Sequence, residues 1–325
     1  MLNSTDSEKI RAFIEGEYPH PRDQDLKRFV YRLWNTFQDH NLNDSIFVPQ
    51  FTSGCRQQLV ERYTEMLFAW HFTQLGFRPT SKDMGPDLYI EHGDKKIWIE
   101  IITPRLTIPL GDGESAQRSA KAIEEYLAPP PNDPNAIRVT DIPTEQILSR
   151  WTSALKEKRE KLTGTIIKNK KTLGYLDKNI VQTNDIYVIA INSISLGHHG
   201  FRGISQLPNA VEATLGVGPI EITINRKTSE IVSEGVSFRP NIINHNQSNI
   251  RTDSFLNPNY KEVSALIANN ISLESNIYSC SKLPIVIVHN PHALNCLPQN
   301  MFGGIEEYVA ENKGDFWEIR NIMRN

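Results

Sequence analysis

Two short apolar runs joined by a turn stand out in the stretch MGPDLYIEHGDKKIWIEIITP. The runs DLYI (87–90) and IWIEII (97–102) have the length of β-strands, and the glycine-containing segment between them is typical of a turn. Because side chains alternate along a strand, Glu100 should share one face with Trp98 and Ile102. The pattern therefore predicts a buried strand with a carboxylate at its centre.

The same kind of pattern predicts the remaining elements. Apolar residues spaced three and four apart indicate helices, and short continuous apolar runs indicate interior strands. Helices are expected near 24–37, 56–76 (ended by Gly76), 144–163 and 257–272, strands at 185–194 and 283–291, and a β-hairpin within 220–233. We interpret the chain as an α/β protein with an N-terminal helical extension over 1–50, one domain over 51–325, and an irregular, lid-like insertion at about 105–143.

Composition narrows the class of protein. The chain has 325 residues, of which 39% are hydrophobic and 22% charged, enough to form a substantial core. No apolar run reaches the roughly 18–20 residues of a membrane span, and the first residues lack a secretory pattern. Three cysteines without metal-site spacing favour a cytoplasmic location. The net charge of −3 means that any nucleic-acid surface must be local, and 156–178, with eight basic against three acidic residues, is a candidate.

A second carboxylate belongs with Glu100. If the two predicted strands pair through their turn, Asp87 at the start of the first strand approaches Glu100 on the second. Two ionised carboxylates repel each other, and a divalent cation such as Mg²⁺ or Mn²⁺ relieves that repulsion. The alternative is that Glu100 pairs with an arginine while Asp87 caps a turn.

At these residues the chain resembles the PD-(D/E)XK nuclease superfamily, which has a restriction-endonuclease-like fold. Gly85, Pro86 and Asp87 match the first part of its signature, and Glu100-Ile101-Ile102 matches the second. The resemblance covers about 56–104 directly and 144–194 by the order of elements. It implies a central mixed sheet flanked by helices and a Mg²⁺ or Mn²⁺ site that includes Asp87 and Glu100.

The sequence departs from this signature at Ile102, where the superfamily has a lysine that positions or activates the attacking water. Some members supply that side chain from a neighbouring helix. Lys158 lies within the apolar stripe of the predicted helix 144–163, so it is our candidate for the displaced lysine. The alternative is a lysine whose stem packs against the sheet while its amine reaches water.

A further glutamate is expected on the preceding helix, 56–76, because the superfamily often has one there. This helix is apolar on two sides, which predicts that it is sandwiched between other elements. Glu65 lies on the second stripe with Phe68 and Phe72, and it is our third candidate metal ligand. A salt bridge to Arg62 is the alternative role.

These residues predict metal-dependent hydrolysis of phosphodiester bonds in nucleic acid, most simply by a DNA endonuclease of the restriction, repair or defence type. The predicted catalytic residues are Glu65, Asp87, Glu100 and Lys158, with Glu65, Asp87 and Glu100 as metal ligands. Two alternatives stay open: a decayed nuclease fold that only binds nucleic acid, and a protein-interaction domain. No membrane partner is expected, and a homodimer is one option for the assembly.

Overall fold

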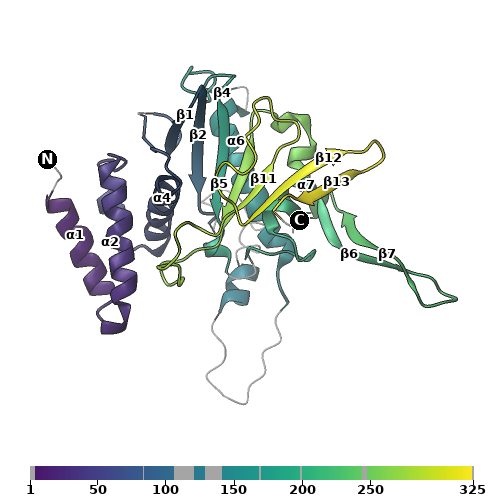
Figure 1. The fold of residues 1–325 in the computed structure, drawn as a ribbon, viewed down its shortest axis with the longest axis horizontal. Coiled ribbons are helices and arrows are strands. Elements are labelled where there is room, and N and C mark those ends of the chain that lie inside the picture. The colour runs from purple at the N-terminus through teal and green to yellow at the C-terminus, as the bar shows by residue number, and fades with distance from the viewer. Residues whose placement is uncertain are drawn as a thin grey trace, which may run out of the picture.

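A seven-stranded mixed sheet lies at the centre of the computed structural model, which describes residues 4–82, 84–105, 121–128, 141–167, 170–197, 200–243 and 247–323. Its strand order is β1-β2-β5-β10-β11-β12-β13 (Figure 1). The pairs β1–β2, β10–β11 and β12–β13 are antiparallel, and the other three are parallel. The strands are β1 (Leu88–His92), β2 (Lys95–Ile102), β5 (Ile186–Asn192), β10 (Ala265–Asn269), β11 (Val286–His289), β12 (Glu306–Asn312) and β13 (Trp317–Asn321).

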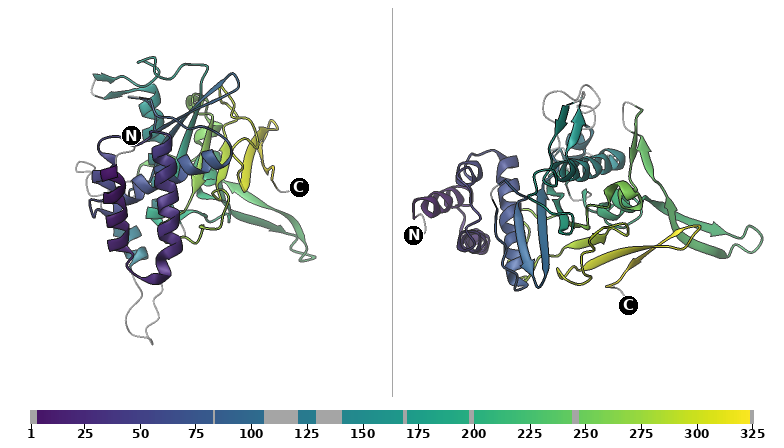
Figure 2. Two further views of the ribbon diagram at one scale, coloured as in Figure 1. Left: turned by 60° about the vertical axis from the view of Figure 1, so that its left-hand side comes forward. Right: turned by 90° about the horizontal axis from the view of Figure 1, so that it is seen from above.

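Helices cover both faces of this sheet, as the α/β prediction required. The helices are α1 (Ser4–Glu17), α2 (Gln24–Asp39), α3 (Phe47–Phe51), α4 (Arg56–Gln74), α6 (Thr144–Thr163) and α7 (Asn209–Leu215). Helix α4 shares one hydrophobic cluster with one face of β2, and α6 and α7 share another cluster with its opposite face. Helices α1 and α2 lie outside α4, on the side away from the sheet (Figure 2). The site described below therefore lies between two helical layers.

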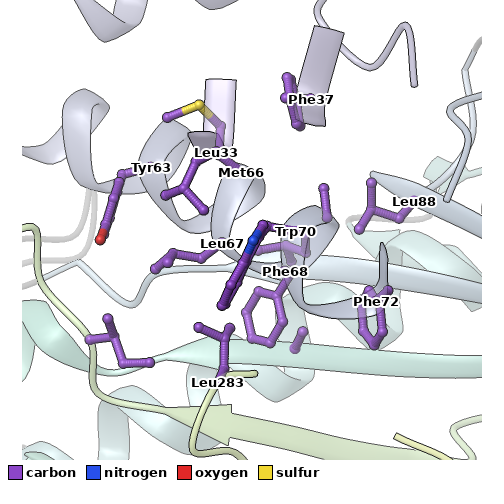
Figure 3. Packing of buried hydrophobic residues seen from close by; sticks show 14 of the residues in the cluster. Leu33, Phe37, Tyr63, Met66, Leu67, Phe68, Trp70, Phe72, Leu88 and Leu283 are labelled. Atoms are coloured by element: carbon purple, nitrogen blue, oxygen red, sulfur yellow. The ribbon is translucent and has the colours of Figure 1, made fainter. Parts of the chain in front are cut away.

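Helix α4 is sandwiched, as its two apolar stripes predicted. Leu33 and Phe37 of α2 lie on one side of it, and Leu88 of β1 and Leu283 lie on the other (Figure 3). The helix ends at Gln74, two residues before Gly76, whose φ of +85° is in the left-handed region that glycine adopts without strain. This packing fixes the side of α4 that carries Glu65.

One predicted element is wrong. Residues 257–272 do not form a helix but contain a short 3₁₀ turn, η5 (Pro258–Tyr260), followed by strand β10. All five residues of β10 are buried, because the strand lies inside the sheet between β5 and β11 and its two faces belong to the two hydrophobic clusters. A strand buried on both faces has no polar alternation, and such a short apolar run does not distinguish strand from helix.

Three two-stranded hairpins and three further 3₁₀ turns complete the described part of the chain. They are β3 (Thr165–Ile167) with β4 (Lys170–Thr172), β6 (Val217–Ile224) with β7 (Ile231–Phe238), β8 (Asn241–Ile243) with β9 (Asn249–Arg251), η1 (Pro21–Asp23), η2 (Ile194–Leu196) and η4 (Ser254–Leu256). The β6–β7 hairpin was predicted, and it extends away from the body of the protein (Figures 1 and 2). Most of the predicted insertion at 105–143 lies outside the described residues, although 121–127 are helical. Among the helices of the described ranges, none combines the length and the apolarity that a membrane crossing needs.

Candidate functional site

The pairing of β1 with β2 brings the two predicted carboxylates together. Leu88 is the register partner of Ile99, which places Asp87, one residue earlier, across from Glu100. The backbone N–H of Ile101 donates a hydrogen bond of 2.6 Å to Oδ2 of Asp87. Because directly opposed residues point to the same side of a sheet, Asp87 and Glu100 share the α6 face.

Glu100 is buried and fully engaged by side chains of the α6 layer. It is 1% exposed. It points to the same face of β2 as Trp98, as the alternation of side chains predicted, and this face packs against α6. Its Oε1 accepts hydrogen bonds of 2.9 Å from Nζ of both Lys158 and Lys161, and its Oε2 accepts one of 3.3 Å from the hydroxyl of Tyr175. The partners of Glu100 are thus two lysines and a tyrosine, not the arginine considered as an alternative.

Lys158 lies where the helix pattern predicted, against the sheet, and it is only 6% exposed. Its amine donates a hydrogen bond to Glu100 and also borders the cleft described below. Burial works to lower the pKa of Lys158, but the charges of Glu100 and Asp87 outweigh burial and raise the pKa above its ordinary value. Lys158 is therefore a permanent cation, able to donate hydrogen bonds and offset negative charge but not to act as a base.

Glu65 forms the salt bridge to Arg62 that was considered as its alternative role. Arg62, one turn earlier on α4, donates hydrogen bonds of 3.1 and 2.9 Å to its two carboxylate oxygens. Burial, followed by the nearby charge of Asp87, raises the pKa of Glu65 to about 8. Burial and the charge of Glu100 likewise raise the pKa of Asp87 to about 6. The three acids and Lys158 thus form one electrostatic unit.

A cleft of about 790 Å³ opens over this unit. The cleft lies beside the last residues of β2 and the segment that follows them. Residues of both α4 and α6 line it. Its lining includes acids and bases in similar number: Asp44, Glu61, Arg62, Glu65, Asp87, Arg105, Arg150, Glu157, Lys158 and Lys161. Asp87, Glu65 and Lys158 line the cleft, as does Ile102, whereas Glu100 lies behind Lys158.

Glu65, Asp87 and Glu100 were predicted to hold one divalent cation together. Within the described ranges no group of three or more His, Cys, Asp or Glu side chains is placed to hold a metal ion, so the predicted set of Glu65, Asp87 and Glu100 is not brought together as one ligand set. Mg²⁺ is often held by only one or two carboxylates, with water and phosphate oxygens completing its shell. Of the two strand acids, Asp87 lines the cleft, whereas both oxygens of Glu100 already accept hydrogen bonds from Lys158, Lys161 and Tyr175.

Two residues of this site were not predicted. Lys161 was not among the candidate residues, yet its long side chain reaches Glu100 while remaining 45% exposed. Tyr175 comes from the segment after β4, 75 residues from Glu100 in the chain. A long basic side chain one turn after Lys158 was the signal for Lys161, whereas no local pattern marks Tyr175.

Comparison with protein-family models, with curated proteins and with solved structures gave no match to this chain. The functional argument therefore depends on the geometry of the site.

The raised pKa of Glu65 predicts a pH-dependent stability. Its pKa is about 8 in the folded protein against an ordinary value of 4.5. The stabilisation that this proton provides is complete below pH 4.5 and is lost as pH rises through 8. Glu65→Gln, which cannot ionise, should therefore match the wild type at pH 5 and exceed its free energy of unfolding by roughly 2–4 kcal/mol at pH 9.

Urea denaturation at pH 5, 7 and 9 measures this difference. Glu61→Gln is the matched control, since Glu61 lies one turn earlier on α4 and lines the same cleft. A difference between Glu65→Gln and wild type that stays constant over this pH range would contradict the expectation.

Proposed function

We propose that this chain is a metal-dependent phosphodiester hydrolase with a restriction-endonuclease-like fold, and that its substrate is nucleic acid, with DNA as the first to test. One observation carries the proposal: Asp87 and Glu100 share one face of adjacent β-segments, and Lys158 of α6 bonds to Glu100 at 2.9 Å beside a cleft. Paired acids with an adjacent lysine are the parts that the PD-(D/E)XK signature requires. The order α4, β1, β2, α6, β5 agrees with the same resemblance.

Each residue has a role in this proposal. Asp87 and Glu100 would hold Mg²⁺ or Mn²⁺, and such an ion stabilises charge on phosphate oxygens and lowers the pKa of its bound water. Lys158, a permanent cation in the cleft, orients the attacking water and offsets the negative charge that develops on the phosphate. Glu65, both of whose oxygens accept hydrogen bonds from Arg62, would contact water bound to the ion rather than the ion itself.

The surroundings of the cleft suit a polyanion in a reducing compartment. Arg62, Arg105, Arg150 and Lys161 line the cleft together with Lys158, and cationic side chains of this kind bind phosphate oxygens. A bound divalent cation would offset the carboxylates that line the cleft in equal number. All three cysteines are free thiols, and two of them are exposed. We include a cytoplasmic location in the proposal on this ground.

A second candidate function is a nucleic-acid-binding module that no longer cleaves. Ile102, an apolar residue, lines the cleft in the position of the signature lysine. Glu100 already accepts two lysine amines, which compete with a cation for its oxygens. Such a protein retains DNA in a salt-dependent manner without cutting it.

The test is cleavage of plasmid and single-stranded DNA with Mg²⁺ or Mn²⁺, compared with EDTA. Asp87→Asn should abolish cleavage, with a loss of at least about 10³-fold, because it removes a metal ligand. It should also keep the protein folded, since burial already favours the neutral form of Asp87 and asparagine Oδ1 still accepts from Ile101. Unfolding curves verify this.

Glu91→Gln is the matched control, because Glu91 lies on the strand that directly follows Asp87, has an exposed side chain, and should leave cleavage unchanged. Cleavage that survives Asp87→Asn, or that EDTA does not affect, would contradict the proposed enzyme. Salt-dependent retention of DNA without metal-dependent cleavage would select the binding module instead.

A further inference from the structure

The β6–β7 hairpin, called here the ribbon, has one apolar face and one polar face. Ile220 pairs with Val236 and Ile224 pairs with Ile231, so these side chains point to the same side. Ile222 lies between Ile220 and Ile224 on that side. The apolar ribbon face consists of Ile220, Ile222, Ile224, Ile231, Val236 and Phe238, with Glu234 opposite Ile222 as a charged residue on the same side. The other face carries Glu221, Thr223, Ser233, Gly235 and Ser237.

The apolar ribbon face is uncovered. Its six side chains are between 42% and 63% exposed, because the ribbon extends away from the body of the protein (Figures 1 and 2). A two-stranded hairpin is marginally stable in water unless its apolar face packs against something. The face therefore needs a cover that does not come from the described part of this chain.

The charges on the ribbon do not suit nucleic acid as the partner that covers its apolar face. Arg226, Lys227 and Glu230 lie in the turn and Glu221 and Glu234 lie on the strands, which leaves a net charge of −1. Phosphate-binding surfaces carry an excess of basic residues. The partner of this face is consequently a protein surface.

We propose that the partner is a second copy of this chain, with the apolar ribbon faces of two copies packed against each other. Six half-exposed side chains offer roughly 400 Å² of apolar surface per copy. A stable interface buries about 800 Å² per partner, of which about 450–500 Å² is apolar. The apolar surface of one ribbon face comes close to that size.

The ribbon is also complementary to itself in charge. In a two-fold dimer each copy uses the same patch, so a residue that contacts a second residue of the other copy is matched by the reverse contact. Ribbons packed in opposite directions bring the turn with Arg226 and Lys227 of each copy toward Glu234 of the other, which lies opposite Ile222 on the apolar ribbon face.

Sedimentation velocity over a range of concentrations tests the proposal, and it needs neither substrate nor metal. The wild type should sediment with twice the mass of the chain. The double variant Ile222→Glu and Ile224→Glu should weaken the dimer by at least about 100-fold, because it places unpaired charges in the apolar contact. The matched control, Thr223→Glu with Ser233→Glu, puts the same charges on the opposite face and should remain dimeric.

Hydrogen exchange gives a second readout that separates loss of the dimer from loss of the fold. Amides of β6 and β7 should be protected in the wild type at high concentration and exchange rapidly in the Ile222/Ile224 variant, while amides of β5 and β10 stay protected in both. A wild type that stays monomeric at about 100 μM, or two double variants with equal dimer affinity, would overturn the proposal.

Discussion

Glu100→Gln should lower the free energy of unfolding by about 3–5 kcal/mol, since it leaves a buried cation without its carboxylate. Lys158 is 6% exposed, and its contact with Glu100 is the one ion pair of this site in which both members are buried. Lys158→Met should cost much less, because Glu100 still accepts hydrogen bonds from Lys161 and Tyr175. Urea denaturation at pH 7 measures both variants.

The double variant Glu100→Gln with Lys158→Met should recover most of that loss and come within about 1 kcal/mol of the wild type, since both charges are removed together. The matched control is Glu100→Gln with Lys161→Met. Lys161 is 45% exposed and keeps its hydration when Glu100 is neutral, so removing it should not restore stability. Equal recovery in the two double variants would show that burial of Lys158 is not the cause.

The two carboxylates could be predicted from the sequence because strand geometry is local. A turn between two apolar runs fixes the register, and the period of two then places Asp87 opposite Glu100. Helix periodicity likewise placed Lys158 on the face of α6 that meets the sheet. The choice between the two roles of Glu65 was different, because a glutamate three residues after Arg62 can turn to Arg62 or to the cleft, and packing decides which.

The rest of the sheet was harder to predict because its strands depend on distant partners. Strands β12 and β13 carry several charged residues and gave no apolar run. Glu307 of β12 is nevertheless fully buried, since it accepts hydrogen bonds from the backbone N–H of Asn300 and lies 2.6 Å from Nε2 of His289 on β11. A pattern of hydrophobic and polar positions does not contain such partners, so it assigns these residues to the surface.

Lys158→Met should reduce the metal-dependent cleavage that we propose by about 10²–10³-fold, because a preorganised cation at the developing charge contributes on that scale. Its pKa is raised above the ordinary value by Glu100 and Asp87 despite burial, so it donates throughout the working pH range. Lys161→Met is the control, since Lys161 is half-exposed and leaves Lys158 in place; a loss below about 10-fold is expected. Initial rates on plasmid DNA measure both variants.

Ile102 stands where the signature has a lysine, and this allows a gain-of-function test of whether Lys158 replaces that lysine. Ile102 lies two residues after Glu100 on the same strand face and lines the cleft, so a lysine there would present its amine to the site that Lys158 serves. Ile102→Lys should therefore restore at least about 10-fold of the cleavage lost in Lys158→Met, because either lysine can supply the cation that the transition state needs. Ile102→Met in the same background is the matched control for side-chain length. Equal rates for the lysine and methionine variants, or a Lys158→Met protein as active as the wild type, would show that Lys158 does not replace the signature lysine.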